Sequence, residues 1–365
     1  MLSEREIQDL AQYNGASPIV SFYIDTDLTH HSKDAVKLMF KQSVKALQDD
    51  KALPSAATGI AAVERFLEFE YDWQSLGVAV FANPEGLWKT VPLPAPVNTQ
   101  GYVGSKPYVR VLSDLLDRFA EYAVAVVDRE GVRLFSVAWG RIQSQTEAMG
   151  EELKRHKQGG WAAARYQRHA DNLALHNLKQ AVELIDAFCR HRECRRLMLA
   201  GNAPVLAQVK ELMPAALREL VIGEFAADME ITANEVLERS LEVAAEAQRA
   251  EEERLVAEAV TAANKGGAGT IGLADTLYAL REGRVRVLLV QEDLQASGYE
   301  CANCGYLTVT EVARCLFCSG EAFVAAPDIV NQAIEQALNA GASIDIVRQN
   351  GALRQAGDMA ALLRY

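Results

Sequence analysis

Residues 122–142, YAVAVVDREGVRLFSVAWGRI, decide the fold of the central part of the chain. Two largely apolar runs, YAVAVV at 122–127 and VRLFS at 132–136, flank the turn-forming interval DREG, and this pattern predicts a β-hairpin. Apolar residues then recur at helical spacing over 165–190, which predicts a helix of about 25 residues. A short strand at 197–199 precedes a further helix. The alternation of strands and helices predicts an α/β layer architecture.

The segment before the hairpin has the same alternation. Strands are predicted at 19–24 (IVSFYI) and 77–81 (GVAVF), and helices over 34–53 and 57–69 between them. The proline-rich stretch 91–97 cannot lie in a central strand, because proline has no amide hydrogen to donate to a neighbouring strand.

The last part of the chain follows a long helix. Residues 231–264 combine many glutamates and arginines with an apolar stripe, which predicts a solvated connecting helix. The glycines of 265–269 are expected to end this helix. Further elements are predicted as helices at 276–281 and 331–338 and strands at 285–290 and 343–347. The predicted fold class is therefore mixed α+β and α/β with three domains: an N-terminal α+β domain 1–118, a middle α/β domain 119–264, and a C-terminal α/β domain 265–365.

Composition excludes several classes of protein. The 365 residues are 50% hydrophobic and 24% charged, which suits two or three globular domains. With 37 basic and 49 acidic residues the net charge is −12, which disfavours a protein coated in nucleic acid and DNA as a partner. No apolar stretch reaches the length of a membrane span, and the amino terminus alternates acids with apolar residues. We therefore expect a cytoplasmic protein without a membrane partner.

Two CxxC pairs, CANC at 301–304 and CLFC at 315–318, are separated by ten residues, and each has a glycine within two positions after it. Each pair can hold one side of a tetrahedral metal ion, so the spacing predicts a structural zinc ribbon inserted at about 299–325. A redox CxxC and a fortuitous pairing are the alternatives. The expected zinc ligands are Cys301, Cys304, Cys315 and Cys318. Of the other two cysteines, Cys189 is expected in the core, and Cys194 fits no pattern.

A basic segment, KRHKQGGWAAARYQRH at 154–169, stands out in an acidic protein. Phosphate contact and an ordinary exposed basic loop are both compatible with it. The expected RNA-binding residues are Lys154, Arg155, Lys157, Arg165 and Arg168. Gly159 and Gly160 leave the backbone free to approach a ligand, and Trp161 can stack on a base or anchor the loop. The sequence holds no HExxH, GxSxG or Walker motif.

GGWAAARYQRH (159–169) resembles the GGQSAxRFxRxR segment of archaeal and eukaryotic class 1 peptide release factors and their Pelota relatives. Other stretches resemble the same family in chain order: PIVSFYIDTD (18–27), LGVAVFAN (76–83), residues 122–142, LMLAGN (197–202), GLADTLYALREGRVRVLLVQEDL (272–294) and GDMAALLRY (357–365). The chain is thus similar to bacterial members of this superfamily, with the zinc ribbon as an insertion in the third domain.

The resemblance implies a tRNA-shaped protein that enters the ribosomal A site and presents the glycine loop to peptidyl-tRNA. The implied partners are the ribosome, peptidyl-tRNA and rRNA, with a translational GTPase as a further candidate. Two departures from the family matter. The stretch 28–35 (LTHHSKDA) is short where stop-codon readers have an Asn-Ile-Lys-Ser loop, and Trp161 replaces the glutamine of GGQ.

These departures favour ribosome rescue or the handling of stalled complexes over stop-codon termination. In a binding role Trp161 stacks on RNA and the chain blocks the A site or marks it for another factor. In a catalytic role Gly159, Gly160 and the amide of residue 161 assist hydrolysis of the peptidyl-tRNA ester, with Gln158 or Gln167 as replacement polar groups. A third possibility is an RNA-binding protein that acts away from the ribosome.

Overall fold

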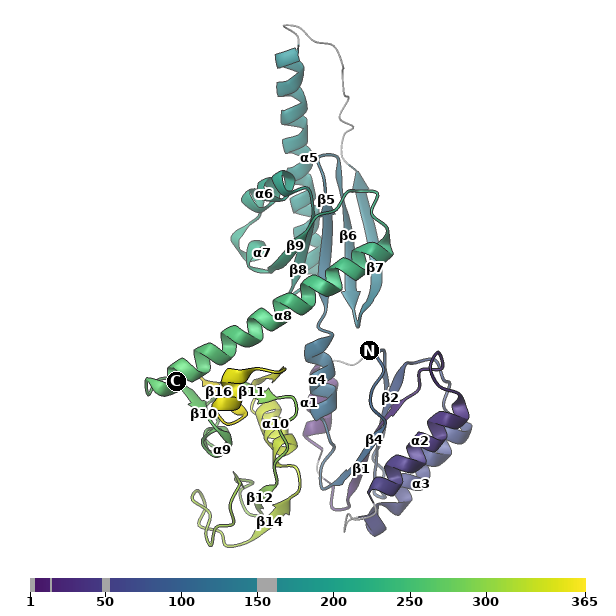
Figure 1. Cartoon of the computed structure of the whole chain (residues 1–365), viewed down its shortest axis with the longest axis vertical. Helices are drawn as coiled ribbons and strands as arrows, with labels where there is room; N and C mark the ends of the chain where they lie inside the picture. The colour runs from purple at the N-terminus through teal and green to yellow at the C-terminus, as the bar shows by residue number, and fades with distance from the viewer. Residues whose placement is uncertain (1–3, 14, 48–52, 150–162) are drawn as a thin grey trace. The chain divides into compact units, whose positions relative to one another are not determined.

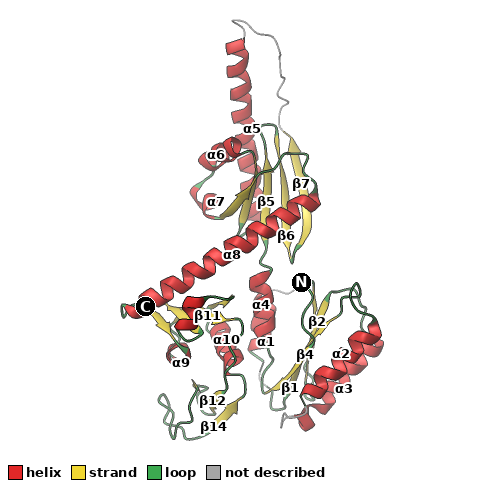
Figure 2. Cartoon of the chain, in the orientation of Figure 1, coloured by secondary structure: helices red, strands yellow, loops and turns green. Residues whose placement is uncertain are grey.

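A computed structural model describes residues 4–13, 15–47, 53–149 and 163–365. These residues form four β-sheets with helices packed against them, which confirms the predicted mixed α/β class (Figure 1). The chain divides into two compact units, Met1–Arg118 with Glu252–Tyr365 and Phe119–Glu251. Both units contain helices and strands (Figure 2). Within the described residues, no helix has the length and apolar character to cross a membrane.

The amino-terminal part of the first unit is a four-stranded antiparallel sheet in the order β3-β2-β1-β4. Its elements are α1 (Glu4–Ala11), β1 (Ile19–Asp25), α2 (Lys33–Ala46), α3 (Leu53–Phe69), β2 (Gly77–Ala82), β3 (Trp88–Leu93), β4 (Gln100–Gly104) and α4 (Arg110–Arg118). Phe22 of β1 is buried against Val36 and Phe40 of α2 and Val63 of α3. The predicted strands at 19–24 and 77–81 are confirmed.

The boundaries of the two predicted helices in this part need correction. The helix predicted over 34–53 ends at Ala46, and the helix predicted over 57–69 begins at Leu53. Pro54 lies in the first turn of the second helix, where its missing amide hydrogen costs no hydrogen bond. Pro92 lies in β3, which is an edge strand, as the exclusion of proline from central strands requires.

The second unit is a five-stranded sheet in the order β7-β6-β5-β8-β9. Its elements are β5 (Tyr122–Val127), β6 (Gly131–Ala138), β7 (Arg141–Met149), α5 (Ala163–His191), β8 (Leu197–Gly201), α6 (Ala203–Leu212), α7 (Ala215–Glu219), β9 (Val221–Phe225) and the first part of α8 (Ala233–Asn264). β5 and β6 form the predicted hairpin, and the Asp128 carboxylate accepts hydrogen bonds from the amides of Glu130 and Gly131 at 2.7 and 2.8 Å.

Strand β5 is buried on both faces because helices cover both sides of the sheet. Ala123, Ala125 and Val127 pack in one cluster with α5 and α6, whereas Tyr122, Val124 and Val126 pack in another with the start of α8. Successive side chains of a strand point to opposite faces, so both sets must be apolar. This explains why 122–127 is continuously apolar, and it confirms the α/β layers predicted for the middle of the chain.

The carboxyl-terminal part of the first unit has a sheet in the order β10-β16-β11-β15 and a small second sheet, β13-β12-β14. Its elements are β10 (Gly269–Ile271), α9 (Leu273–Arg281), β11 (Val285–Gln291), β12 (Gly298–Cys301), β13 (Leu307–Thr308), β14 (Phe323–Ala326), α10 (Ile329–Asn339), β15 (Ser343–Val347), α11 (Gly351–Gln355) and β16 (Met359–Leu363). The small sheet lies between β11 and α10 in the chain. We call residues 298–326 the cysteine ribbon.

The amino- and carboxyl-terminal parts of this unit are joined by buried and partly buried polar contacts. The Asn331 side-chain oxygen accepts hydrogen bonds from the amides of Val109 and Arg110 at 3.0 and 3.1 Å, which satisfies donors at the start of α4. The Tyr108 hydroxyl donates to Asp328 at 2.8 Å. The Arg110 guanidinium donates to the Leu294 carbonyl at 2.7 Å.

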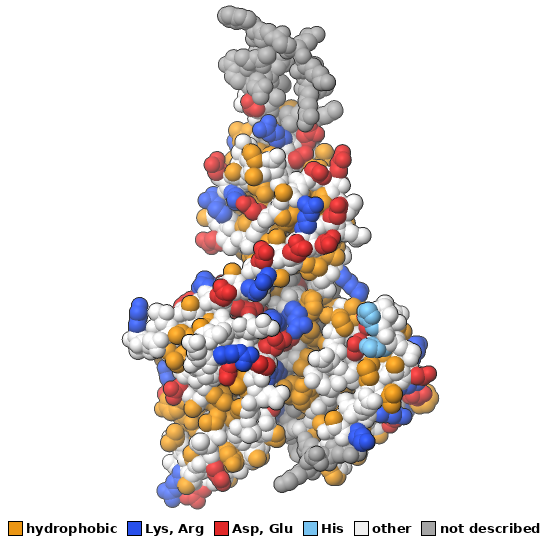
Figure 3. Space-filling view, in the orientation of Figure 1, with side chains coloured by type: hydrophobic (Ala, Val, Ile, Leu, Met, Phe, Trp, Pro, Cys, Tyr) orange, Lys and Arg blue, Asp and Glu red, His pale blue; other side chains and the backbone are white. Residues whose placement is uncertain are grey.

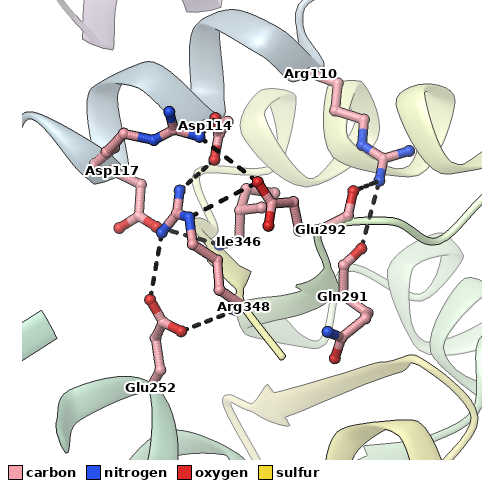
Figure 4. A network of polar contacts seen from close by, with 9 residues as sticks. Arg110, Asp114, Asp117, Glu252, Gln291, Glu292, Ile346 and Arg348 are labelled. Carbon is pink, nitrogen blue, oxygen red and sulfur yellow. Dashed lines mark hydrogen bonds and ion pairs between the residues drawn. The ribbon is translucent and has the colours of Figure 1, made fainter. Parts of the chain in front are cut away.

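Arg348 directly follows β15, and its side chain contacts carboxylates from three other segments (Figure 4). Its guanidinium contacts Asp114 of α4 and lies 3.4 Å from Glu252 of α8 and 3.9 Å from Glu292. Its backbone amide also donates to Glu252 at 2.9 Å. Arg348 therefore ties together α4 and α8, the two helices through which the chain passes between the units.

Candidate metal centre and glycine segment

The four cysteines predicted as metal ligands come together at one end of the cysteine ribbon. Their sulfur atoms all lie within 4.8 Å of one another. The Cys301 and Cys318 sulfurs are 3.6 Å apart, and the Cys304 and Cys315 sulfurs are 3.5 Å apart. In a tetrahedral zinc site with Zn–S bonds of about 2.3 Å, neighbouring sulfurs are about 3.8 Å apart. The donor set and its spacing therefore fit a tetrahedral, thiophilic metal ion.

The backbone folds in the same way around both CxxC pairs. The amide of Gly305 donates to the Cys301 carbonyl at 2.8 Å, and the amide of Ser319 donates to the Cys315 carbonyl at 3.0 Å. The residue after each pair has a left-handed backbone, with φ of +76° at Gly305 and +58° at Ser319. Glycine adopts this conformation without strain and serine does not. The two turns thus present their sulfurs to one point from opposite sides.

Hydrogen bonds at the second turn favour a thiolate. The Asn303 side chain and the backbone of Gly320 lower the pKa of Cys318 to about 6. A Cβ atom at Gly320 would lie 3.3 Å from the Cys318 sulfur, so the glycine lets the backbone come close to it. The sequence indicated both glycines, but it gave no sign that Asn303, inside the first CxxC, supports a sulfur of the second.

Aromatic side chains pack the four-cysteine cluster against the rest of the unit. Cys301 and Cys315 are buried, with 1% and 3% of their surface exposed. The Phe317 ring lies 4.8 Å from the Tyr306 ring and 5.0 Å from the Tyr278 ring of α9. The contact with α9 fixes the turn that carries Cys315 and Cys318 to the neighbouring helix.

Residues 154–162, which we call the glycine segment, lie between β7 and α5 in the chain. Lys154, Arg155, Lys157, Gly159, Gly160 and Trp161 are outside the described residues. Arg165 and Arg168 lie in the first turns of α5, although their side chains are not among those described. The helix predicted over 165–190 is confirmed as α5, and Cys189 is buried on its apolar face as expected.

Comparisons with known proteins point to one group. Residues 107–245 match the family model described as bacterial archaeo-eukaryotic release factor family 10. Peptide chain release factor subunit 1 of Methanopyrus kandleri is 28% identical over 224 residues, which cover 58% of this chain and 54% of that protein. Eukaryotic peptide chain release factor subunit 1 of Dictyostelium discoideum is 27% identical over 216 residues, 56% of this chain and 48% of that protein. The chain spans about half the length of these curated relatives.

Solved structures of the same group also align with the chain. Archaeal translation termination factor aRF1 aligns with 16% identity and a TM-score of 0.27, covering 100% of this chain and 99% of that one. Dom34 of S. cerevisiae, a translation termination-like factor that interacts with Hbs1, aligns with 11% identity and a TM-score of 0.41, covering 81% and 82%. The matches to the family model over residues 107–245 and to the two curated relatives confirm the predicted resemblance to archaeal and eukaryotic release factors.

Proposed function

We propose that the chain binds the ribosomal A site and acts in ribosome rescue or the handling of stalled complexes. The observation that carries this proposal is the match of residues 107–245 to a release-factor family, in the unit that bears the glycine segment. One aligned structure is a model of ribosome-bound archaeal Pelota and ABCE1, so a relative of this fold is known on the ribosome.

The contact with rRNA is assigned to the basic residues around the glycine segment. Figure 3 shows acidic and basic side chains mixed over the described surface of the face that it draws. A net charge of −12 makes diffuse attraction to RNA unfavourable, so a local cluster must supply the phosphate contacts. Lys154, Arg155, Lys157, Arg165 and Arg168 form such a cluster within 15 residues. Dom34 interacts with Hbs1, so a translational GTPase is a further partner to test for this chain.

Binding without efficient hydrolysis is the role that Trp161 favours. Ester hydrolysis needs a water beside the carbonyl carbon and hydrogen-bond donors for the developing oxyanion. A backbone amide at position 161 could donate to the oxyanion, but an indole is bulkier than the glutamine side chain of the family and would compete with the water for space. The same indole can stack on an RNA base, a contact worth about 1 to 3 kcal/mol.

Single-turnover release of labelled peptide from 70S complexes separates this role from a hydrolase. We expect little release by the wild-type chain and none above background from Gly160→Ala, in which a side chain restricts the loop backbone. Robust release by wild type that Gly160→Ala abolishes and Trp161→Ala leaves unchanged would make the chain a peptidyl-tRNA hydrolase. Trp161→Gln restores the family residue and measures how much the indole suppresses the reaction.

We propose that Cys301, Cys304, Cys315 and Cys318 would hold one structural zinc ion in the cysteine ribbon. The four thiolates fill the coordination sphere, which leaves no open position for substrate or water. When bound, the ion crosslinks the two CxxC turns and supplies fold stability to the ribbon. Metal analysis of the purified chain should give one zinc per chain, and Cys304→Ser should lose the metal while the second unit stays folded. Absence of zinc together with a Cys301–Cys304 disulfide would contradict this assignment.

A further inference from the structure

A second pair of cysteines lies in the other unit, at the carboxyl end of α5. Cys189 is on the apolar face of α5 and has 3% of its surface exposed. Cys194 lies in the turn between α5 and β8 and is partly buried against the same core cluster. Neither residue is near the cysteine ribbon in the chain, and neither has a role in the proposed ribosome contact.

The backbone turn after α5 brings these two side chains together. The amide of Cys194 donates to the Cys189 carbonyl at 2.9 Å, and the amide of Glu193 donates to the Arg190 carbonyl at 3.3 Å. Glu193 has a left-handed backbone, with φ of +52°. These two hydrogen bonds around a left-handed residue define the Schellman motif, in which the first and last residues make a side-chain contact. Here both of those residues are cysteines.

The two thiols differ in their surroundings. The hydrogen bond between them raises the pKa of the Cys189 thiol, and burial raises it further. The same hydrogen bond lowers the pKa of Cys194, and the positive charge of Arg192 also lowers it. Cys194 is thus the more exposed sulfur and the one that more readily becomes a thiolate, whereas Cys189 is a protonated thiol held beside it. Thiolate character and access together control cysteine reactivity.

We propose that Cys189 and Cys194 form a reversible oxidation site, in which a peroxide oxidises Cys194 and Cys189 resolves the product as a disulfide. The Cys194 thiolate attacks the hydroxyl oxygen of the peroxide, the O–O bond breaks, and a sulfenic acid forms while hydroxide or an alkoxide leaves and takes a proton from solvent water. The Cys189 sulfur then attacks the Cys194 sulfur. The S–S bond forms, the S–O bond breaks, and the leaving hydroxide takes the Cys189 proton as water. Two electrons pass from the sulfurs to the peroxide.

The disulfide would close the turn covalently and hold the carboxyl end of α5. The hydrogen-bonded turn of residues 189–194 already places the two thiols in hydrogen-bond contact. Because the amino end of α5 follows the glycine segment, the site lies on the helix that carries Arg165 and Arg168. The inference does not depend on ribosome binding or on zinc.

Tryptic mapping tests the site directly, because Arg190 and Arg192 separate the two cysteines. Residues 180–190 carry Cys189 and residues 193–195 carry Cys194, while the ribbon cysteines lie on other tryptic peptides. The full chain is treated with hydrogen peroxide, alkylated in denaturant and digested without reductant. We expect the two peptides to appear joined by a disulfide. Their mass should be about 2 Da below the sum of the reduced peptides, because disulfide formation removes two hydrogen atoms. Treatment with dithiothreitol should separate them.

Two variants check the assigned roles. In Cys189→Ala, the Cys194 sulfenic acid should persist and be trapped by dimedone at least about tenfold more than in wild type, because the resolving thiol is absent. In Cys194→Ala, Cys189 should stay reduced at the same peroxide dose. The proposal is wrong if native wild type keeps both thiols while the ribbon cysteines are oxidised, or if the joined peptides form only after denaturation.

Discussion

Trp161 is the residue on which the proposed role depends most. Base stacking contributes about 1 to 3 kcal/mol, so Trp161→Ala should weaken binding to 70S ribosomes by about tenfold or more. Trp161→Phe is the matched control, because a phenyl ring retains a face for stacking and should recover most of the affinity. Equilibrium sedimentation with labelled chain measures both. Equal affinity of wild type and Trp161→Ala would show that the indole only anchors the loop.

Gly305 and Ser319 occupy equivalent positions in the two CxxC turns. Substitutions at the two positions should therefore change the stability of the ribbon in opposite directions. A Cβ atom at Gly305 would meet neighbours only at 3.5 and 3.8 Å, so Gly305→Ala should destabilise the ribbon mainly through its left-handed backbone, by about 1 kcal/mol. Ser319→Gly should remove the same strain and stabilise the ribbon by a similar amount. Competition with a zinc chelator reports both changes. A loss of metal affinity in Ser319→Gly would contradict the strain argument.

At the scale of elements, a buried carboxyl on α10 makes the first unit sensitive to pH. Glu335 is fully buried, accepts a hydrogen bond from Asn331 at 2.6 Å and lies 3.7 Å from the Lys106 ammonium. Burial raises the pKa of Glu335 to about 8, although Lys106 opposes this shift and Glu300 adds to it. The ordinary pKa of this group is 4.5. At pH values between 4.5 and about 8, Glu335 therefore keeps its proton in the folded chain and has lost it in the unfolded chain.

Stability should therefore fall as pH rises from about 4.5 to 8, by up to about 1.4 kcal/mol per pH unit from this group. Glu335→Gln keeps an acceptor for Asn331 and carries no proton to lose, so its denaturation midpoint should vary less with pH across that window. Glu258→Gln, at an exposed position of α8, is the control and should follow wild type. Parallel pH profiles for Glu335→Gln and wild type would contradict the assignment.

The elements that could be predicted are those whose burial produces a periodic pattern. The strands β2 and β5 are continuous apolar runs, β1 and β11 are mostly apolar, and α5 has a clear apolar face. β7 was missed because its residues RIQSQTEAM are mostly exposed on an edge strand, and few are apolar. β4 was missed because all five of its residues are only half-buried.

The clustering of the four ribbon cysteines was predictable because their spacing is local in the chain. The four sulfurs come from two short turns whose geometry the CxxC pattern already specifies. The Arg348 cluster was not predictable, because its carboxylates come from α4, α8 and residue 292, far apart in the chain. The contact between Cys189 and Cys194 depends on the left-handed backbone of Glu193. The sequence gives no signal for this conformation, because the position is not a glycine.

At the scale of the whole molecule, charge separates a local RNA contact from diffuse attraction. Replacing Lys154, Arg155, Lys157, Arg165 and Arg168 with Gln should weaken ribosome binding and reduce its salt dependence by about one unit of slope per lost phosphate contact at most. Changing Glu238, Glu242, Glu246, Glu253 and Glu258 of α8 to Gln shifts the net charge by an equal amount in the opposite direction and should have little effect. An equal and opposite effect of the α8 changes would indicate diffuse electrostatics.

The most direct test of the central claim is binding to 70S ribosomes whose A site is either vacant or filled with cognate aminoacyl-tRNA. A chain that enters the A site competes with tRNA, so we expect saturable binding to the vacant complex and at least about tenfold weaker binding to the filled one, since occupied sites exclude the competitor. Equal affinity for the two complexes would contradict A-site binding. No detectable binding to either would contradict a ribosomal role for the chain.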